Sequence, residues 1–186
     1  MPTKPIIAIY ENGMVKTVDF LRNELKSVRT GRASPGLVEN LSVDYYGSPT
    51  PLKSLATITV PEPAMIVIKP FDPESLKDIE KAIKNSDLSL APMAEGKMVR
   101  LNIPPLSEER RKQIVHQVKQ LGEKNKVSIR NIRRDANKQL DDELKNKTIT
   151  EDDSKKGKSN VDDITKKYVD QIDEIVKAKS EEIMNS

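Results

Sequence analysis

The feature that most constrains the fold is an unbroken helical pattern of about 40 residues in the second half of the chain. Ser107-Glu108-Glu109 predicts a helix start, and the pattern continues to about Asn146. Such a helix would be about 60 Å long, so it needs neighbouring elements along its length. Its apolar residues keep to one slowly drifting face, namely Ile114, Val118, Leu121, Ile129, Ile132, Ala136, Leu140 and Leu144.

An earlier helix is predicted from Met14 to Thr30, with Gly31 as its C-terminal cap. Residues 1–11 contain two prolines, so we expect them to make a poor first turn, and their role is left open. The apolar residues are spaced four and three apart, which predicts packing along one narrow stripe: Met14, Val18, Leu21, Leu25 and Val28.

A last helix is predicted after the turn at 146–150, where Thr150 and Asp153 have the spacing of a capping box. Its inward-facing residues are Val161, Ile164, Tyr168, Ile172, Ile175 and Ile183. Three amphipathic helices with reversing connections predict an antiparallel bundle formed by residues 1–30 and 106–186.

Residues 31–105 have a different texture and are predicted to form a separate inserted domain. They contain ten of the twelve prolines and short β-like runs at 41–46, 56–60, 65–68 and 98–103. Asp72-Pro73-Glu74 supplies an N-cap and a first-turn proline for one helix among these runs. The predicted fold class is therefore α+β, an antiparallel three-helix bundle with an inserted small β/α/β domain.

The chain must cross between the two predicted domains twice, at Thr30, Gly31 and Arg32 and again at Pro104 and Pro105. One crossing has little side-chain bulk and the other is stiffened by proline, so we predict a two-strand hinge that allows rotation. The alternative is a rigid elbow fixed by contacts between the domains.

Basic charge is concentrated in part of the chain. The net charge is +3, but residues 106–146 carry +4 and residues 1–30 carry +2, while residues 31–105 and 147–186 are slightly acidic. A localised basic excess is typical of a surface that binds a polyanion.

Positively charged side chains recur at helical spacing on two of the predicted helices. On the long helix a seven-residue repeat is extended by two further arginines: Lys112, Lys119, Lys126 and Arg133, with Arg130 and Arg134. On the first helix a shorter series has spacings of four and three residues, namely Arg22, Lys26 and Arg29, with Arg32 just beyond. Such stripes suit RNA phosphates, although a charge run is also common on a solvated face. Few aromatics accompany them, which favours folded RNA over single-strand stacking. The candidate RNA-binding residues are Arg29, Arg32, Lys112, Lys119, Lys126, Arg130, Arg133 and Arg134.

Signals of an enzyme are weak. The chain has no cysteine, and its single histidine, His116, lies in mid-helix, where a surface role is expected. The sequence contains no phosphate loop, dinucleotide fingerprint or nucleophile elbow. We therefore expect no catalytic residues, no cofactor and no metal site. The absence of a long apolar run or signal-peptide layout predicts a cytoplasmic protein that does not enter a membrane.

Four segments together resemble the bacterial ribosome recycling factor family, in the order and spacing that the family uses. They are RTGRASPGL at 29–37, YYGSPTPL at 45–52, PPLSEERRK at 104–112 and RNIRRDAN at 130–137. The resemblance covers essentially the whole chain. It implies an L-shaped molecule in which the bundle lies against large-subunit ribosomal RNA.

The resemblance also implies a function without catalysis. A family member binds the post-termination ribosome and, with elongation factor G and GTP hydrolysis by that factor, separates the subunits, as a monomer. The family's RNA-contacting arginines correspond to Arg130, Arg133, Arg29 and Arg32. The alternatives are a general ribosomal-RNA chaperone without splitting activity and an enzyme hidden in the insert.

Overall fold

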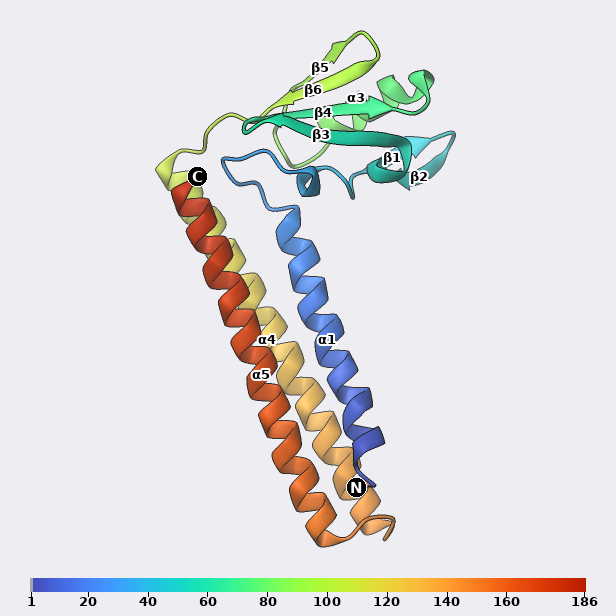
Figure 1. Cartoon of the computed structure of the whole chain (residues 1–186), viewed down its shortest axis with the longest axis vertical. Coiled ribbons are helices and arrows are strands. Elements are labelled where there is room, and N and C mark those ends of the chain that lie inside the picture. Colours follow the sequence, from blue (N-terminus) through green and yellow to red (C-terminus); the bar gives the residue numbers. More distant parts are fainter. Residues whose placement is uncertain (1) are drawn as a thin grey trace. The chain divides into compact units, whose positions relative to one another are not determined.

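The computed structural model describes residues 2–186, which divide into two compact units (Figure 1). The helical unit holds the chain up to Leu25 together with Val115–Glu181, and the sheet unit holds Lys26–Ile114 and Glu182–Ser186. Three long helices supply the helical unit: α1 Lys4–Lys26, α4 Glu108–Lys145 and α5 Glu151–Asn185. Both α4 and α5 continue through the division without a break.

Within the helical unit the three helices run side by side in alternating directions, which confirms the antiparallel bundle (Figure 1). Most of the predicted apolar positions within this unit are buried in its core, although some, including Leu121 and Ile132, are only partly buried. Val28, predicted on the same stripe, lies beyond the end of α1 in the sheet unit. Leu21, Ile129 and Ile172 are fully buried, one from each helix. At one end of the unit, the start of α1 packs into a second cluster, formed by Ile7, Ala136, Leu140, Ile149 and Val161. Burial of these aliphatic stripes stabilises helices of this length.

Both ends of α1 differ from the sequence prediction. The helix begins at Lys4, so the expectation that residues 1–11 make a poor first turn was wrong for the described residues 4–11. Pro5 is the second helical residue, where its missing N–H leaves no intrahelical hydrogen bond unmade. The helix also ends at Lys26, five residues before Gly31, so Gly31 is not its cap.

The predicted starts of α4 and α5 are confirmed by their capping hydrogen bonds. Ser107 Oγ accepts from the Arg110 N–H at 3.2 Å. Thr150 and Asp153 cap each other: the Asp153 N–H donates to Thr150 Oγ1 at 3.1 Å, and the Thr150 N–H donates to Asp153 Oδ2 at 3.3 Å. These bonds satisfy amide groups that a helix start leaves without intrahelical partners.

The sheet unit contains a four-stranded antiparallel sheet in the order β3-β4-β6-β5. Its strands are β3 Ala56–Glu62, β4 Met65–Pro70, β5 Pro92–Glu95 and β6 Met98–Asn102. Helix α3, Leu76–Lys84, buries Ile79 and Ile83 in the same core as the strand residues Ile66, Ile68 and Val99. Beside this core lies a hairpin of β1, Ser42–Tyr45, and β2, Ser48–Pro51. Shorter helical segments complete the unit: η1 Pro35–Leu37, α2 Leu52–Leu55 and η2 Pro73–Ser75.

The four predicted β-like runs are confirmed as β1, β3, β4 and β6. Strands β2 and β5 were not predicted. Each has four residues and contains proline, which hides the alternation of a longer strand.

The two ends of the insert lie against one turn of the sheet unit. The Ala33 N–H donates to the Pro63 carbonyl, and the Ile103 N–H donates to the Ala64 carbonyl, each at 2.7 Å. Because Pro63 and Ala64 are adjacent in the turn between β3 and β4, the chain enters and leaves the insert at neighbouring points. None of the helices in residues 2–186 is long and apolar enough to cross a membrane.

Candidate RNA-binding face

The seven-residue repeat of cations on α4 does not keep to one side of the helix. Seven residues at about 100° each fall short of two full turns by about 20°, so three repeats shift the stripe by about 60°. Lys119 is exposed, whereas Lys126 and Arg133 are partly buried. The later members of the repeat have therefore moved towards the edge of α4 that packs against the bundle.

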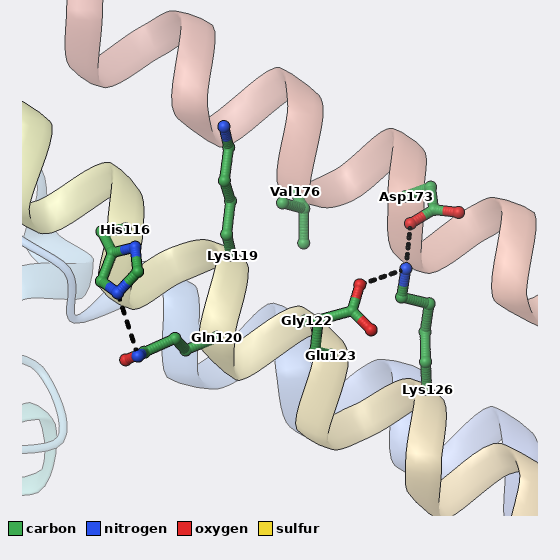
Figure 2. Close-up of a pocket in the computed structure, with 8 residues that line it drawn as sticks. All are labelled: His116, Lys119, Gln120, Gly122, Glu123, Lys126, Asp173 and Val176. Carbon is green, nitrogen blue, oxygen red and sulfur yellow. Dashed lines mark hydrogen bonds and ion pairs between the residues drawn. The ribbon is translucent and has the colours of Figure 1, made fainter.

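Lys126 is held between two carboxylates at the boundary of α4 and α5 (Figure 2). Its Nζ lies 2.8 Å from Asp173 Oδ1 and 2.5 Å from Glu123 Oε1, and only 13% of the side chain is exposed. The hydrogen bonds to Asp173 and then Glu123 raise the pKa of Lys126 above its ordinary value. Its charge is already compensated within the protein, so it is poorly placed to bind a phosphate.

A groove of about 800 Å³ lies between α4 and α5 in the helical unit (Figure 2). At its floor the helices approach closely, because a Cβ on Gly122 would lie 2.5 Å from Cγ2 of Val176. His116 and Lys119 stand at one end of the groove, and the Lys126 ion pairs stand at the other. His116 is exposed and its Nε2 lies 3.0 Å from Nε2 of Gln120, which confirms its predicted surface position.

The exposed face of α4 carries several accessible cations. Lys119, Arg130 and Arg134 are exposed, and none forms an ion pair within residues 2–186. Arg130 and Arg134 are four residues apart, so their side chains neighbour each other on the helix surface. Arg133 lies at the edge of this face and is half-buried.

Sequence reasoning missed further cations around the same helix. Lys138 follows Arg134 by another four residues and is exposed. On the side facing α1, Lys124 and Lys16 line a small groove together with Phe20, whose side chain is 56% exposed. The four-residue spacing was visible in the sequence for Lys138, but the pairing of Lys124 with α1 depends on tertiary packing.

Arg29 lies in the sheet unit and does not continue the stripe of α1. The helix ends at Lys26, so the predicted helical alignment of Arg29 was wrong. Its guanidinium donates from Nη2 to the Pro104 carbonyl at 3.0 Å and from Nη1 to the Leu88 carbonyl at 3.4 Å. Burial, followed by repulsion from Arg110, lowers the pKa of Arg29. Arg29 therefore ties together chain segments far apart in the sequence.

The other predicted residues of the sheet unit are more open. The side chain of Lys112 is 65% exposed and pairs with Glu108 at 2.7 Å. Arg32 is exposed, and its backbone N–H donates to Thr30 Oγ1 at 3.3 Å. The Gly31 N–H donates to Ser186 Oγ at 3.1 Å. All the predicted hinge residues, Thr30, Gly31, Arg32, Pro104 and Pro105, lie within the sheet unit.

Comparison with known proteins gives a consistent result over most of the chain. The sequence model of the family described as "Ribosome recycling factor" matches residues 21–184. The chain is 52% identical over 147 residues to the ribosome-recycling factor of Myxococcus xanthus, covering 79% of this chain and 80% of the relative. It is 54% identical over 138 residues to that of Rhodopirellula baltica, covering 74% of each.

Two solved structures resemble the chain over essentially its full length. A solution structure of the ribosome recycling factor matches with a TM-score of 0.78 and 38% identity, covering 100% of this chain and 99% of the other. The second structure is described as models for the T. thermophilus ribosome recycling factor and the E. coli elongation factor G bound to the E. coli post-termination complex. It matches with a TM-score of 0.68 and 40% identity, covering 99% of this chain and 100% of the other.

Proposed function

The chain belongs to the ribosome recycling factor family, and from this premise we propose that it binds the post-termination ribosome and promotes separation of the subunits. It acts with elongation factor G, whose GTP hydrolysis drives the step. The observation that supports this most strongly is the family match, which spans both units of the fold. The chain contributes binding and force transmission, and no catalytic centre of its own is proposed.

Contact with large-subunit ribosomal RNA is assigned to the exposed face of α4. Three charged side chains of this face are exposed and form no ion pair within residues 2–186, namely Arg130, Arg134 and Lys119. Binding a phosphate therefore disrupts no existing ion pair. Arginine can bind phosphate with two parallel hydrogen bonds and keeps its charge at all physiological pH values. Counterions released from the RNA supply a large share of the free energy of such contacts.

The remaining predicted RNA contacts rank lower on this geometry. Lys126 and Arg29 would first have to give up their present carboxylate and carbonyl partners. Arg133 is half-buried but reaches the edge of the exposed face, while Lys112 and Arg32 are exposed within the sheet unit.

We assign the contact with elongation factor G to the insert, residues 31–105, whose sequence is slightly acidic. The predicted hinge at Thr30–Arg32 and Pro104–Pro105 would pass the movement of the insert to the RNA-bound helices. The insert's ends already meet at Pro63 and Ala64, which supports a module that can be removed without separating α1 from α4. The protein is proposed to work as a monomer in the cytoplasm, where its ribosomal partner resides.

The test of this function is the dissociation of post-termination ribosomes, followed by light scattering and sedimentation, with the protein, elongation factor G and GTP. Separation of the subunits is expected, and it should disappear when GTP is replaced by a nonhydrolysable analogue. Binding without separation would instead favour the RNA-chaperone alternative. The absence of both binding and separation would refute the assignment.

A variant with residues 33–103 replaced by a short Gly/Ser linker tests the division of labour. It should keep a helical circular-dichroism spectrum and bind isolated large subunits, because the cations of α4 remain. It should fail to split ribosomes, because elongation factor G has lost its point of contact. Splitting at the intact protein's rate would refute the role assigned to the insert.

A further inference from the structure

The tip of the β1–β2 hairpin holds an exposed aromatic side chain in an unfavourable backbone conformation. Tyr45 pairs with Ser48, which leaves Tyr46 and Gly47 as a two-residue turn. Their φ angles are 50° and 79°, and two positive values mark a type I′ turn, in which Asn, Asp or Gly is preferred at the first position. A tyrosine is strained there, yet its side chain is 76% exposed and contributes little to the core. Strain held at an exposed residue points to a role outside folding.

Carboxylates surround this aromatic residue. The Tyr46 hydroxyl donates to Glu74 Oε2 at 3.4 Å, and the Tyr45 hydroxyl donates to Asp72 Oδ2 at 3.1 Å. The two rings meet edge to face with centroids 4.6 Å apart. The negative charges of Asp72 and Glu74, with a smaller effect of Asp78, raise the pKa of Tyr46.

A groove lined in part by Asp78 and a second exposed aromatic, next to Asp72 in the sequence, extend this region. Phe71, the residue before Asp72, is 68% exposed. A groove of about 400 Å³ runs between β1 and α3, with Leu41 and Ala82 among its apolar lining. Asp44 and Asp78 contribute carboxylates to this lining and Lys81 contributes a single cation, so acidic charge predominates.

We propose that this aromatic–acidic patch, formed by Tyr45, Tyr46, Phe71, Asp72, Glu74 and Asp78, docks a lysine- or arginine-rich segment of a protein partner. A cation is attracted to the face of an aromatic ring, and neighbouring carboxylates strengthen that attraction. The methylene stem of a long basic side chain fits the apolar part of the groove. RNA is disfavoured because its phosphates would meet the carboxylates, so the patch and the basic face of α4 select opposite charges.

Binding of a basic peptide to the patch does not depend on the proposed function. The expectation that the patch contacts its partner on the ribosome does rest on that function. The first test therefore uses the free chain. A decapeptide of alternating arginine, lysine and glycine is titrated at low salt while the amide signals are followed by NMR. Saturable shifts should centre on Tyr46, Gly47 and residues 71–78, and an acidic decapeptide should produce none.

The variant Tyr46→Asn combined with Glu74→Gln removes the ring and one charge. Asparagine is favoured in a type I′ turn, so the hairpin should stay folded. Peptide binding should weaken at least fivefold. The matched control, Met93→Asn with Glu62→Gln, alters an exposed apolar residue and an exposed acid elsewhere in the sheet unit and should bind normally. Equal binding by the two variants, or shifts spread over the acidic residues of α5, would overturn the proposal.

The second test places p-benzoyl-phenylalanine at position 46 and irradiates the full chain on post-termination ribosomes. A cross-link to a basic protein segment supports the proposal, and a cross-link to RNA overturns it. If the chain does not bind ribosomes at all, the proposed function fails, but the peptide titration still decides what the patch recognises.

Discussion

Adding one methyl group at Gly122 should force α4 and α5 apart. The new Cβ would lie 2.5 Å from Cγ2 of Val176, and valine has few rotamers with which to retreat. Overpacking of this kind costs about 1–3 kcal/mol. Alanine recovers roughly 0.8–1 kcal/mol of helix propensity over glycine. The two effects leave Gly122→Ala destabilised by about 1 kcal/mol, within a range of about 0–2.

The matched control is Gly13→Ala, another glycine inside a long helix of the same unit. Its new Cβ would lie 3.6 Å from Cδ1 of Ile132, an ordinary contact distance. Only the propensity gain should remain, so this variant should be stabilised by about 0.5–1 kcal/mol. The same substitution is thus expected to have opposite signs at two helical positions.

The assay is urea denaturation followed by circular dichroism at 222 nm, with Val176→Ala and the Gly122→Ala/Val176→Ala double variant completing a cycle. Removing the valine methyl groups should relieve the clash, so the double variant should be more stable than the two single effects added together. If both glycine variants are stabilised equally and the cycle shows no coupling, the close approach of α4 and α5 is refuted.

Three other substitutions and one pH dependence test separate parts of the structure. Arg130→Ala should weaken binding to large subunits and flatten the slope of log affinity against log salt by about one unit, while an unchanged slope would remove it from the interface. Leu25→Ala should lower the free energy of unfolding by about 2–4 kcal/mol, because the side chain is only 4% exposed; a loss below about 0.5 kcal/mol would contradict its place in the core. Hydrogen bonds from Thr150 lower the pKa of Asp153. The ionised side chain therefore stabilises the fold at pH values above its ordinary pKa near 3.8, and this stabilisation is lost as the pH falls through the lowered pKa. Asp153→Ala should remove this part of the pH dependence of stability, as measured by urea denaturation at a series of acidic pH values. Arg29→Lys keeps the positive charge, but a lysine cannot bond to both carbonyls as the planar guanidinium does. The sheet unit should therefore unfold at a lower urea concentration, while the salt dependence of RNA binding should change little. The reverse pattern would show that Arg29 is an RNA contact.

The helices were predictable because their signals are local. Buried positions such as Val118 and Leu140 recur at helical spacing, and the caps at Ser107 and Thr150 lie within three residues of their partners. The end of α1 was not predictable in this way. Arg29 bonds to carbonyls 59 and 75 residues away in sequence, and these contacts outweigh local helix propensity.

The candidate RNA-binding face was only partly predictable for a similar reason. The sequence indicated which residues of α4 are basic, but the side that faces α5 depends on a partner such as Asp173, which lies 47 residues from Lys126. The patch around Tyr46 could not be predicted either, because its carboxylates come from the N-cap of η2, from η2 and from α3 rather than from the hairpin itself. Spacing predicts a residue's side of a helix but not what packs there.

The attachment of Ala33 and Ile103 to one turn also affects how the chain folds. Bringing α1 and α4 together through an unfolded segment of about 70 residues carries an entropy cost that grows as (3/2)RT ln n, roughly 4 kcal/mol before other terms. Once the insert has folded, its two anchored ends replace that long segment by a short connection, and the same helices meet as if joined by a tight loop. The insert is therefore expected to act as a folding nucleus for the bundle, so substitutions in its core at Ile66 or Leu101 should slow the formation of helical contacts they never touch.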